Sequence, residues 1–197
     1  MEMIEVLKKF LIFFFSLFLI ILSLSFISSL SFLFFFTIIP LAWAGCSFAP
    51  WVPTKKRDLK RVFELANLKE GERVYELGFG DGRFILEAVK KYNVKGYGVE
   101  IIPFFYLYVL LRRFFLKNKK NLVLKWGNLF NVDLSPADVV YFWGLPETIE
   151  KKLKAKLERE LKPGTRVISY VFEIKGWKPE RVSLKEGEVP IFLYKKS

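Results

Sequence analysis

The stretch Val74-Tyr-Glu-Leu-Gly-Phe-Gly-Asp-Gly-Arg-Phe84 decides the fold, because a short strand pattern runs directly into three alternating glycines. A glycine-rich turn between a strand and a helix lets the backbone approach a ligand, since any Cβ there would collide with it. Gly78 and Gly80 fit the dinucleotide pattern G-x-G-x-x-G, but Arg83 stands where its third glycine belongs. The spacing is instead E-x-G-x-G-x-G from Glu76 to Gly82, and no P-loop pattern occurs in the chain. The stretch therefore predicts a ligand loop that serves neither a dinucleotide nor a triphosphate.

Strands and helices alternate around this loop. Apolar periodicity predicts strands at 73–77, 96–100, 122–126, 139–143, 167–173, 181–184 and 189–194, and helices at 59–66, 83–91, 103–116 and 145–161. This alternation predicts an α/β fold with a doubly wound, mostly parallel sheet. The short link between the last two strands predicts a C-terminal hairpin that adds an antiparallel strand.

Two further polar residues follow neighbouring strands. Glu100 stands 24 residues after Glu76 at the end of the next predicted strand, where a carboxylate can accept two hydrogen bonds from a ribose diol. Asn128 follows the third strand, where its amide could contact an adenine edge. These positions predict a pocket at the carboxyl ends of adjacent strands, where open α/β sheets bind ligands.

Taken together, the loop, the acid and the amide resemble those of the class I S-adenosylmethionine-dependent methyltransferases. The resemblance implies a Rossmann-like fold, S-adenosyl-L-methionine as the cofactor and methyl transfer as the reaction. It also implies that Glu100 binds the cofactor's ribose and Asn128 its adenine. The amino-acid part would lie on the glycine loop, with Glu76, Gly78, Gly80, Asp81 and Gly82 as cofactor-binding residues.

A narrower resemblance rests on Ala49-Pro-Trp-Val-Pro-Thr54, which is similar to a segment of the membrane-associated protein-lysine methyltransferases. This family includes the mitochondrial enzymes that modify the ATP synthase c-subunit and the adenine nucleotide translocase, with archaeal and bacterial relatives. Gly80–Arg83, Leu157–Val167 and Gly176–Pro179 match it as well. The resemblance implies a lysine side chain of a protein as acceptor, and contact of Pro53 and Thr54 with the cofactor.

The sequence departs from that family at Phe79 and at Trp143-Gly144. The second departure lies beside the expected methyl-transfer site, so Trp143 is the candidate for a catalytic role, as a wall of the substrate channel. A purely structural role for Trp143, in the core, remains open.

Structural alternatives also remain open for other candidates. Pro53 and Thr54 could stiffen the chain and cap the next helix. Glu76 could be a capping carboxylate, and Asp81 could pair with Arg83 at a helix start. For Glu147, a place at a helix N-terminus is favoured over catalysis.

Residues 10–54 carry no charge, and about 20 apolar residues span a bilayer. The run is too long for a cleaved signal. We expect a membrane anchor over residues 1–54, either one long span or a two-span hairpin with its turn at Ser28–Ser31, followed by a methyltransferase domain over residues 55–197. Lys8, Lys9 and Lys55–Arg57 flank both ends, which favours the hairpin and a domain facing the cytoplasm.

The net charge of +12 falls entirely on residues 55–197, because Glu2 and Glu5 balance Lys8 and Lys9. A basic domain beside a membrane favours membrane lipid as a partner. The outer face of 103–116 is apolar on nearly every side and is a candidate bilayer contact. A nucleic-acid partner is not favoured, because no compact basic binding motif occurs. The asparagine-proline-proline motif of nucleobase methyltransferases is also absent after the fourth strand.

The chain has no histidine and one cysteine, Cys46, which excludes a histidine base, a histidine or cysteine metal site and an internal disulfide. The sequence thus predicts a membrane-anchored methyltransferase that acts on protein lysine, with a membrane-associated protein as its substrate and with no metal. One alternative is an enzyme that methylates a lipid, a quinone or another membrane-dissolved small molecule. The other is a cofactor-binding membrane module without catalysis.

Overall fold

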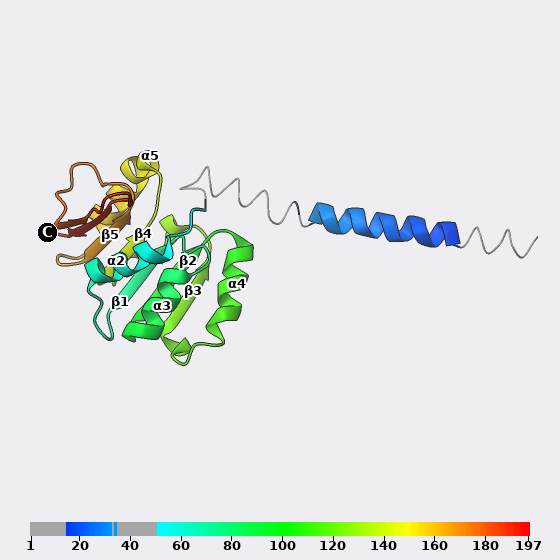
Figure 1. Ribbon diagram of the computed structural model, residues 1–197, viewed down its shortest axis with the longest axis horizontal. Helices are drawn as coiled ribbons and strands as arrows, with labels where there is room; N and C mark the ends of the chain where they lie inside the picture. The colour runs from blue at the N-terminus through cyan, green and yellow to red at the C-terminus, as the bar shows by residue number, and fades with distance from the viewer. Residues whose placement is uncertain (1–14, 33, 35–50) are drawn as a thin grey trace, which may run out of the picture. The chain divides into compact units, whose positions relative to one another are not determined.

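The computed structural model describes residues 15–32, 34 and 51–197, and the chain divides into two units, Met1–Ile39 and Pro40–Ser197 (Figure 1). In the first unit, Phe15–Phe32 form one helix with a mean hydropathy of 2.2. By length and composition this helix can cross a membrane.

The turn predicted at Ser28–Ser31 is wrong, because these residues are helical. Ser29 Oγ donates to the Ser25 carbonyl at 2.8 Å, and Ser31 Oγ donates to the Ile27 carbonyl at 2.9 Å. A serine hydroxyl that bonds one helical turn back needs no break in the helix. Most of the second span of the predicted hairpin, residues 32–49, lies outside the described residues.

The second unit is built on a seven-stranded sheet in the order β3-β2-β1-β4-β5-β7-β6. The strands are β1 Arg73–Leu77, β2 Lys95–Glu100, β3 Leu122–Trp126, β4 Val139–Phe142, β5 Arg166–Tyr170, β6 Arg181–Ser183 and β7 Ile191–Lys195. The first five strands are parallel, and β7 runs antiparallel between β5 and β6. The predicted doubly wound sheet and its antiparallel C-terminal hairpin are both confirmed.

Helices cover both faces of this sheet. The helices are α2 Lys56–Ala66, α3 Arg83–Tyr92, α4 Pro103–Arg113, α5 Pro146–Thr148 and α6 Lys154–Glu160, with single turns at Lys119–Asn121 and Leu129–Asn131. Apolar residues of α2, α3 and α4 form one core with the sheet. The helical run from α5 to α6 forms the other core on the opposite face. Helix α2 ends at Ala66, where the sequence predicts its end, and Asn67 after it takes the left-handed conformation.

The predicted helix 145–161 contains a π-helical turn at Ile149–Leu153 between α5 and α6. Its apolar residues recur every four positions, and Ile149, Leu153, Leu157 and Leu161 are all buried. In a regular α-helix a strict four-residue repeat drifts around the axis, because one turn takes 3.6 residues. The wider turn offsets this drift and keeps the whole stripe on the sheet.

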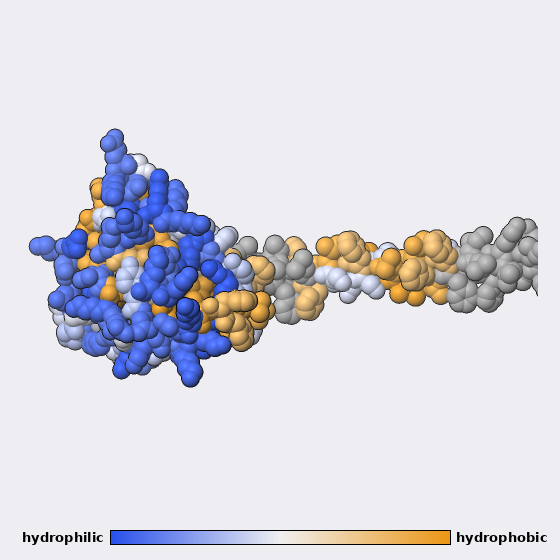
Figure 2. Space-filling view, turned by 60° about the horizontal axis from the view of Figure 1, so that its bottom comes forward, coloured by the Kyte–Doolittle hydropathy of each residue, from blue (hydrophilic) through white to orange (hydrophobic). Residues whose placement is uncertain are grey.

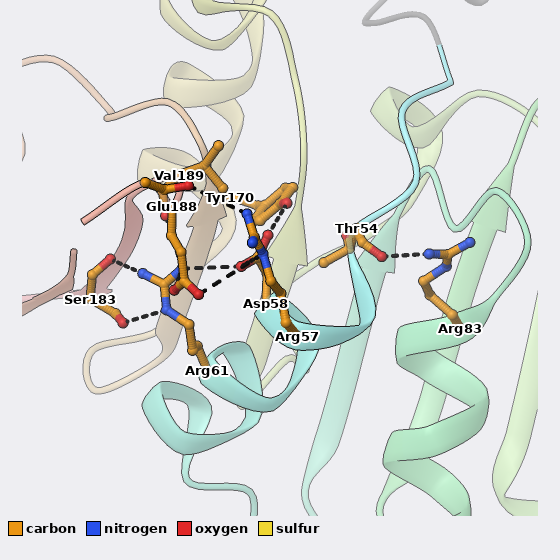
Figure 3. A network of polar contacts seen from close by, with 10 residues as sticks. Thr54, Arg57, Asp58, Arg61, Arg83, Tyr170, Ser183, Glu188 and Val189 are labelled. Atoms are coloured by element: carbon orange, nitrogen blue, oxygen red, sulfur yellow. Dashed lines mark hydrogen bonds and ion pairs between the residues drawn. The ribbon is translucent and has the colours of Figure 1, made fainter. Parts of the chain in front are cut away.

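A buried polar network fixes α2 to the C-terminal hairpin (Figure 3). Asp58 Oδ1 accepts from Arg61 Nη1 at 3.2 Å, and Asp58 Oδ2 accepts from the Tyr170 hydroxyl at 2.8 Å. Arg61 also donates to Ser183 and forms an ion pair with Glu188 at 3.0 Å. Burial, and next the bond to Asp58, raises the pKa of Tyr170 to about 12. The network holds the start of α2, and hence the residues just before it, against the sheet.

Candidate active site

One pocket lies at the carboxyl ends of β1, β2 and β4, the edge of the sheet where the sequence predicts a ligand. Its lining includes eight of the ten predicted site residues: Pro53, Thr54, Glu76, Gly78, Asp81, Glu100, Asn128 and Trp143. The other two, Gly80 and Gly82, lie in the same loop but do not line the pocket. Residues from five separate stretches of the chain are thus brought together.

Glu100 ends β2 and organises the glycine loop. Its Oε2 accepts from the Gly80 amide at 2.7 Å, and its Oε1 accepts from the amides of Ile101 and Ile102 at 2.9 Å each. Burial raises the pKa of Glu100, and these three backbone bonds oppose that rise. The side chain is therefore a fixed acceptor in the wall of the pocket, with its orientation set by the backbone on both sides.

Glu76 is the second buried carboxyl of the pocket. It lies in β1, and its Oε2 accepts from the Ile85 amide in the first turn of α3 at 3.0 Å. Burial is the main cause that raises its pKa well above 4.5, and the negative charges of Asp81 and Glu100 add to it. The site thus concentrates acidic groups around a space that suits a cationic ligand.

Glu76 is expected to lower stability at neutral pH in the absence of ligand. The unfolded chain releases this proton near pH 4.5, whereas the folded protein retains it to higher pH, so stability falls as pH rises above 4.5. Glu76→Gln keeps an acceptor for the Ile85 amide and removes the ionisation. We expect the Tm of this variant to exceed that of the wild type at pH 7 and to match it near pH 4.

The matched control is Glu87→Gln on α3, whose carboxylate is on the surface and pairs with Lys91. Its Tm should stay close to that of the wild type at both pH values, because exposed ion pairs contribute little. A Tm below that of the wild type at pH 7 for Glu76→Gln would show that the charged carboxylate stabilises the fold.

The glycine loop needs its glycines for contacts with two other segments. Gly80 has φ +52°, and a Cβ there would lie 2.6 Å from Nε1 of Trp51. Gly82 has φ +70° at the start of α3, where a Cβ would lie 2.7 Å from Val109 of α4. Gly80 therefore gives room to the chain that precedes α2, and Gly82 gives room to a helix.

Phe79 has a partner that accounts for its size. The ring is buried against Gly98 of β2, where a Cβ would lie 2.7 Å from the Phe79 ring. The large residue in the loop is thus accommodated by a glycine in the neighbouring strand.

Thr54 is held in the pocket wall by two contacts. Its carbonyl accepts from Arg83 Nη1 at 2.5 Å (Figure 3). Arg83 in turn pairs with Asp81. Its hydroxyl lies 2.6 Å from the Tyr141 hydroxyl of β4. The expected pairing of Asp81 with Arg83 is present, and it links the residues before α2 to the loop after β1.

Asn128 and Trp143 lie in different parts of the lining. Asn128 Oδ1 accepts from the Phe130 amide at 3.0 Å, so its amide nitrogen is the group that remains to donate to a ligand. Trp143 directly follows β4, is half-buried, and its ring centroid lies 6.5 Å from that of Phe172. Glu147 is on the surface in an ion pair with Lys151 and does not line this pocket.

Trp51 and Tyr141 are pocket residues that the sequence analysis did not select. Trp51 packs on Phe105 with ring centroids 4.7 Å apart and covers Gly80. The signal for Trp51 was its place inside the quoted Ala49–Thr54 segment. Tyr141 had no such signal, because its partner Thr54 is 87 positions away in the chain.

A sheet in this strand order, with a glycine loop after β1 and an acid at the end of β2, defines a class I methyltransferase, and its cofactor is S-adenosylmethionine. More narrowly, the chain belongs to the family of the ANTKMT methyltransferase domain, whose pattern matches residues 76–181. It is 41% identical to a protein-lysine N-methyltransferase of Saccharolobus islandicus, over 74% of this chain and 92% of that one. It is 27% identical to the mouse lysine N-methyltransferase of the ATP synthase c-subunit, over 74% of this chain and 57% of the mouse enzyme.

Among solved structures, the chain is similar to an RNA methyltransferase from Salinibacter ruber in complex with S-adenosyl-L-homocysteine. The identity is 33%, the TM-score is 0.69, and the match covers 73% of this chain and 93% of that one. A second structure, a protein called MtNAS in complex with S-adenosylmethionine, has a TM-score of 0.58 at 19% identity and supports the fold.

Proposed function

We propose that this protein is a membrane-anchored enzyme that transfers a methyl group to a lysine side chain of a membrane-associated protein. The observation that carries the proposal is the 41% identity to a protein-lysine N-methyltransferase over 92% of that enzyme. Residues 1–54, with the apolar helix Phe15–Phe32, are the proposed anchor, and residues 55–197 are the proposed catalytic domain. The basic residues on both flanks of the apolar run support a catalytic domain on the cytoplasmic side.

The pocket fits the cofactor in charge and in hydrogen-bonding groups. S-adenosylmethionine carries an ammonium, a sulfonium and a ribose diol, and the pocket offers the two buried carboxyls of Glu76 and Glu100. We assign the ribose to Glu100, whose position is fixed by three amides. The amide nitrogen of Asn128 is assigned to the adenine.

The remaining cofactor residues hold the amino-acid part. Gly78 and Asp81 line the pocket, and Gly80 and Gly82 shape the loop beneath it, so we assign all four to this part. Glu76 lies below the same loop, where its carboxyl would face a cationic group. Pro53 and Thr54 complete the wall and are held there through Arg83 and Tyr141.

The protein's part in the reaction is to position the acceptor and to exclude water. The bound cofactor supplies an electrophilic methyl group, so the protein needs no nucleophile of its own. Trp143 is assigned to the acceptor channel, and Tyr141 and Phe142 stand beside it in the lining. Burial in a channel that excludes water removes the solvation of the charged ammonium of an entering lysine, and this desolvation promotes the neutral, nucleophilic form.

The test is transfer of a labelled methyl group from S-adenosylmethionine to native membranes by the full-length enzyme. Label in a protein band that maps to lysine by mass spectrometry supports the proposal. Label in the organic extract would point to a lipid or quinone acceptor, and no label despite cofactor binding would point to a non-catalytic module. Glu147→Gln, which alters an exposed ion pair, is the matched control and should keep full activity.

RNA is the second candidate acceptor, because the Salinibacter ruber protein that is 33% identical to this chain is an RNA methyltransferase. The net charge of +12 is compatible with binding to phosphates. The same labelling reaction with added total RNA separates the two acceptors. Label that is sensitive to ribonuclease and absent from protein bands would favour RNA.

A further inference from the structure

The outward face of α4 is apolar, where a surface helix normally carries polar side chains. Positions 104, 107, 108 and 111 follow one helical stripe of α4, and positions 114 and 115 continue the apolar surface in the turn after the helix. All six are between 43% and 89% exposed: Phe104, Leu107, Tyr108, Leu111, Phe114 and Phe115. The inner side of α4 is buried through Phe105 and Val109. The helix thus has two apolar sides, of which only one is covered by the described residues.

More apolar surface adjoins the N-terminal end of α4. Trp51 and Val52 are exposed, and the Trp51 ring packs on Phe105. Trp126 is exposed at the end of β3, and its Nε1 donates to the Ile101 carbonyl at 3.0 Å. In Figure 2 an orange area interrupts the blue surface on the side of this unit where Figure 1 places α4. We call this surface, the stripe on α4 with Trp51, Val52 and Trp126, the α4 face.

The C-terminal end of the same face is basic. Residues 103–120 contain five basic and no acidic side chains: Arg112, Arg113, Lys117, Lys119 and Lys120. Arg112 lies over the Tyr108 ring at 5.6 Å, so the cationic and apolar parts are in contact. A protein partner could match the apolar part alone, whereas an apolar stripe edged by cations matches the acyl and phosphate layers of an anionic bilayer.

We propose that the α4 face lies on the surface of an anionic phospholipid bilayer and forms a second membrane contact beside the anchor. The inference rests on the proposed anchor. Its further support is Trp51, which lies near the end of the uncharged run 10–54 and is exposed as part of this face, while its ring packs on Phe105 of α4. Exposed tryptophan and tyrosine, as at Trp51, Tyr108 and Trp126, are typical of residues at the depth of lipid headgroups.

This placement bears on the acceptor. Trp51, Ile101 and Ile102 line the cofactor pocket, and Ile102 directly precedes α4, so the pocket and the α4 face share a wall. With the face on lipid, the pocket is held near the headgroups. The favoured acceptor is then a lysine of a membrane protein that lies at the depth of the lipid headgroups.

The test uses the full chain in nanodiscs and a fluorophore on one cysteine. Cys46→Ser removes the native thiol, and Leu111→Cys places the label on the α4 face. A nitroxide at headgroup depth in discs containing phosphatidylglycerol should quench at least about half of this signal. The same label at Glu186→Cys, in the exposed link between β6 and β7, should keep its signal.

Each outcome is decisive. Unquenched Leu111→Cys in anionic discs overturns the proposal, and the face is then covered by protein. Equal quenching in discs of phosphatidylcholine alone overturns the assignment to an anionic surface. The readout needs no acceptor, so quenching without methyl transfer would count against the proposed activity and not against this contact. If the chain does not insert into the discs, both the proposed membrane anchor and the proposed contact of the α4 face are contradicted.

Discussion

Replacing Glu100 with alanine is expected to weaken binding of S-adenosylmethionine by about 100-fold. The change removes the carboxylate assigned to the ribose, and two charge-assisted hydrogen bonds contribute about 3 kcal/mol. It also removes the acceptor for the amides of Gly80, Ile101 and Ile102, so the glycine loop loses its support. Isothermal titration with S-adenosylhomocysteine measures the affinity without turnover.

The isosteric variant Glu100→Gln separates charge from shape. It keeps one acceptor oxygen but places an NH₂ group against a backbone amide, so we expect a loss of about 10-fold, from one hydrogen bond to a charged group. Glu147→Gln should bind as the wild type does, because Glu147 is exposed and outside the pocket. Unchanged affinity in Glu100→Ala would exclude this pocket as the cofactor site.

Replacing Asp58 with alanine is expected to destabilise the catalytic domain by about 3–5 kcal/mol, the usual cost of removing one partner of a buried ion pair. Asp58 is fully buried, and its loss leaves the Tyr170 hydroxyl and one Arg61 nitrogen without this acceptor. For a chain of this size the Tm should fall by about 10 °C. Near-UV circular dichroism of the full chain in detergent follows the aromatic core during heating.

Glu64→Ala on the same helix is the matched control for Asp58. Glu64 is exposed and lies 4.0 Å from Lys60, an arrangement that contributes about 0.5 kcal/mol or less. Asp58→Asn should be intermediate, because it keeps acceptor capacity without charge. If Asp58→Ala and Glu64→Ala melt at the same temperature, the network of Figure 3 does not stabilise the fold.

The parts of the site that the sequence could predict are those that follow a strand directly. Glu76, the glycine loop and Glu100 lie within 25 residues of chain, and the alternation of strands and helices brings them to one edge of the sheet. Strands β1 and β3 were predicted at their observed bounds for the same reason, since their patterns are local. For these elements the local sequence pattern alone was enough to predict the structure.

Other features depend on contacts between distant residues, which periodicity does not encode. The hydrogen bond between Thr54 and Tyr141 joins residues 87 positions apart in the chain. The close contact of Trp51 with Gly80 forms only when the glycine loop is folded, so the sequence pattern does not predict it. The serines at 28–31 suggested a turn because serine is common in turns, but the residues are helical, and the hydroxyls of Ser29 and Ser31 bond within the helix. Which residues of α4 are exposed likewise depends on the distant residues that pack against its buried side.

Because Trp51–Thr54 form part of the pocket wall, proteolytic cleavage just after them would affect the site. A protease that trims the chain at Lys55 would leave α2, the sheet and both cores intact. It would nevertheless take away the carbonyl that Arg83 holds and the indole that covers Gly80. If the proposed anchor holds the chain at a membrane, cleavage at that point would release a domain without this part of its pocket wall, so attachment and activity would end together.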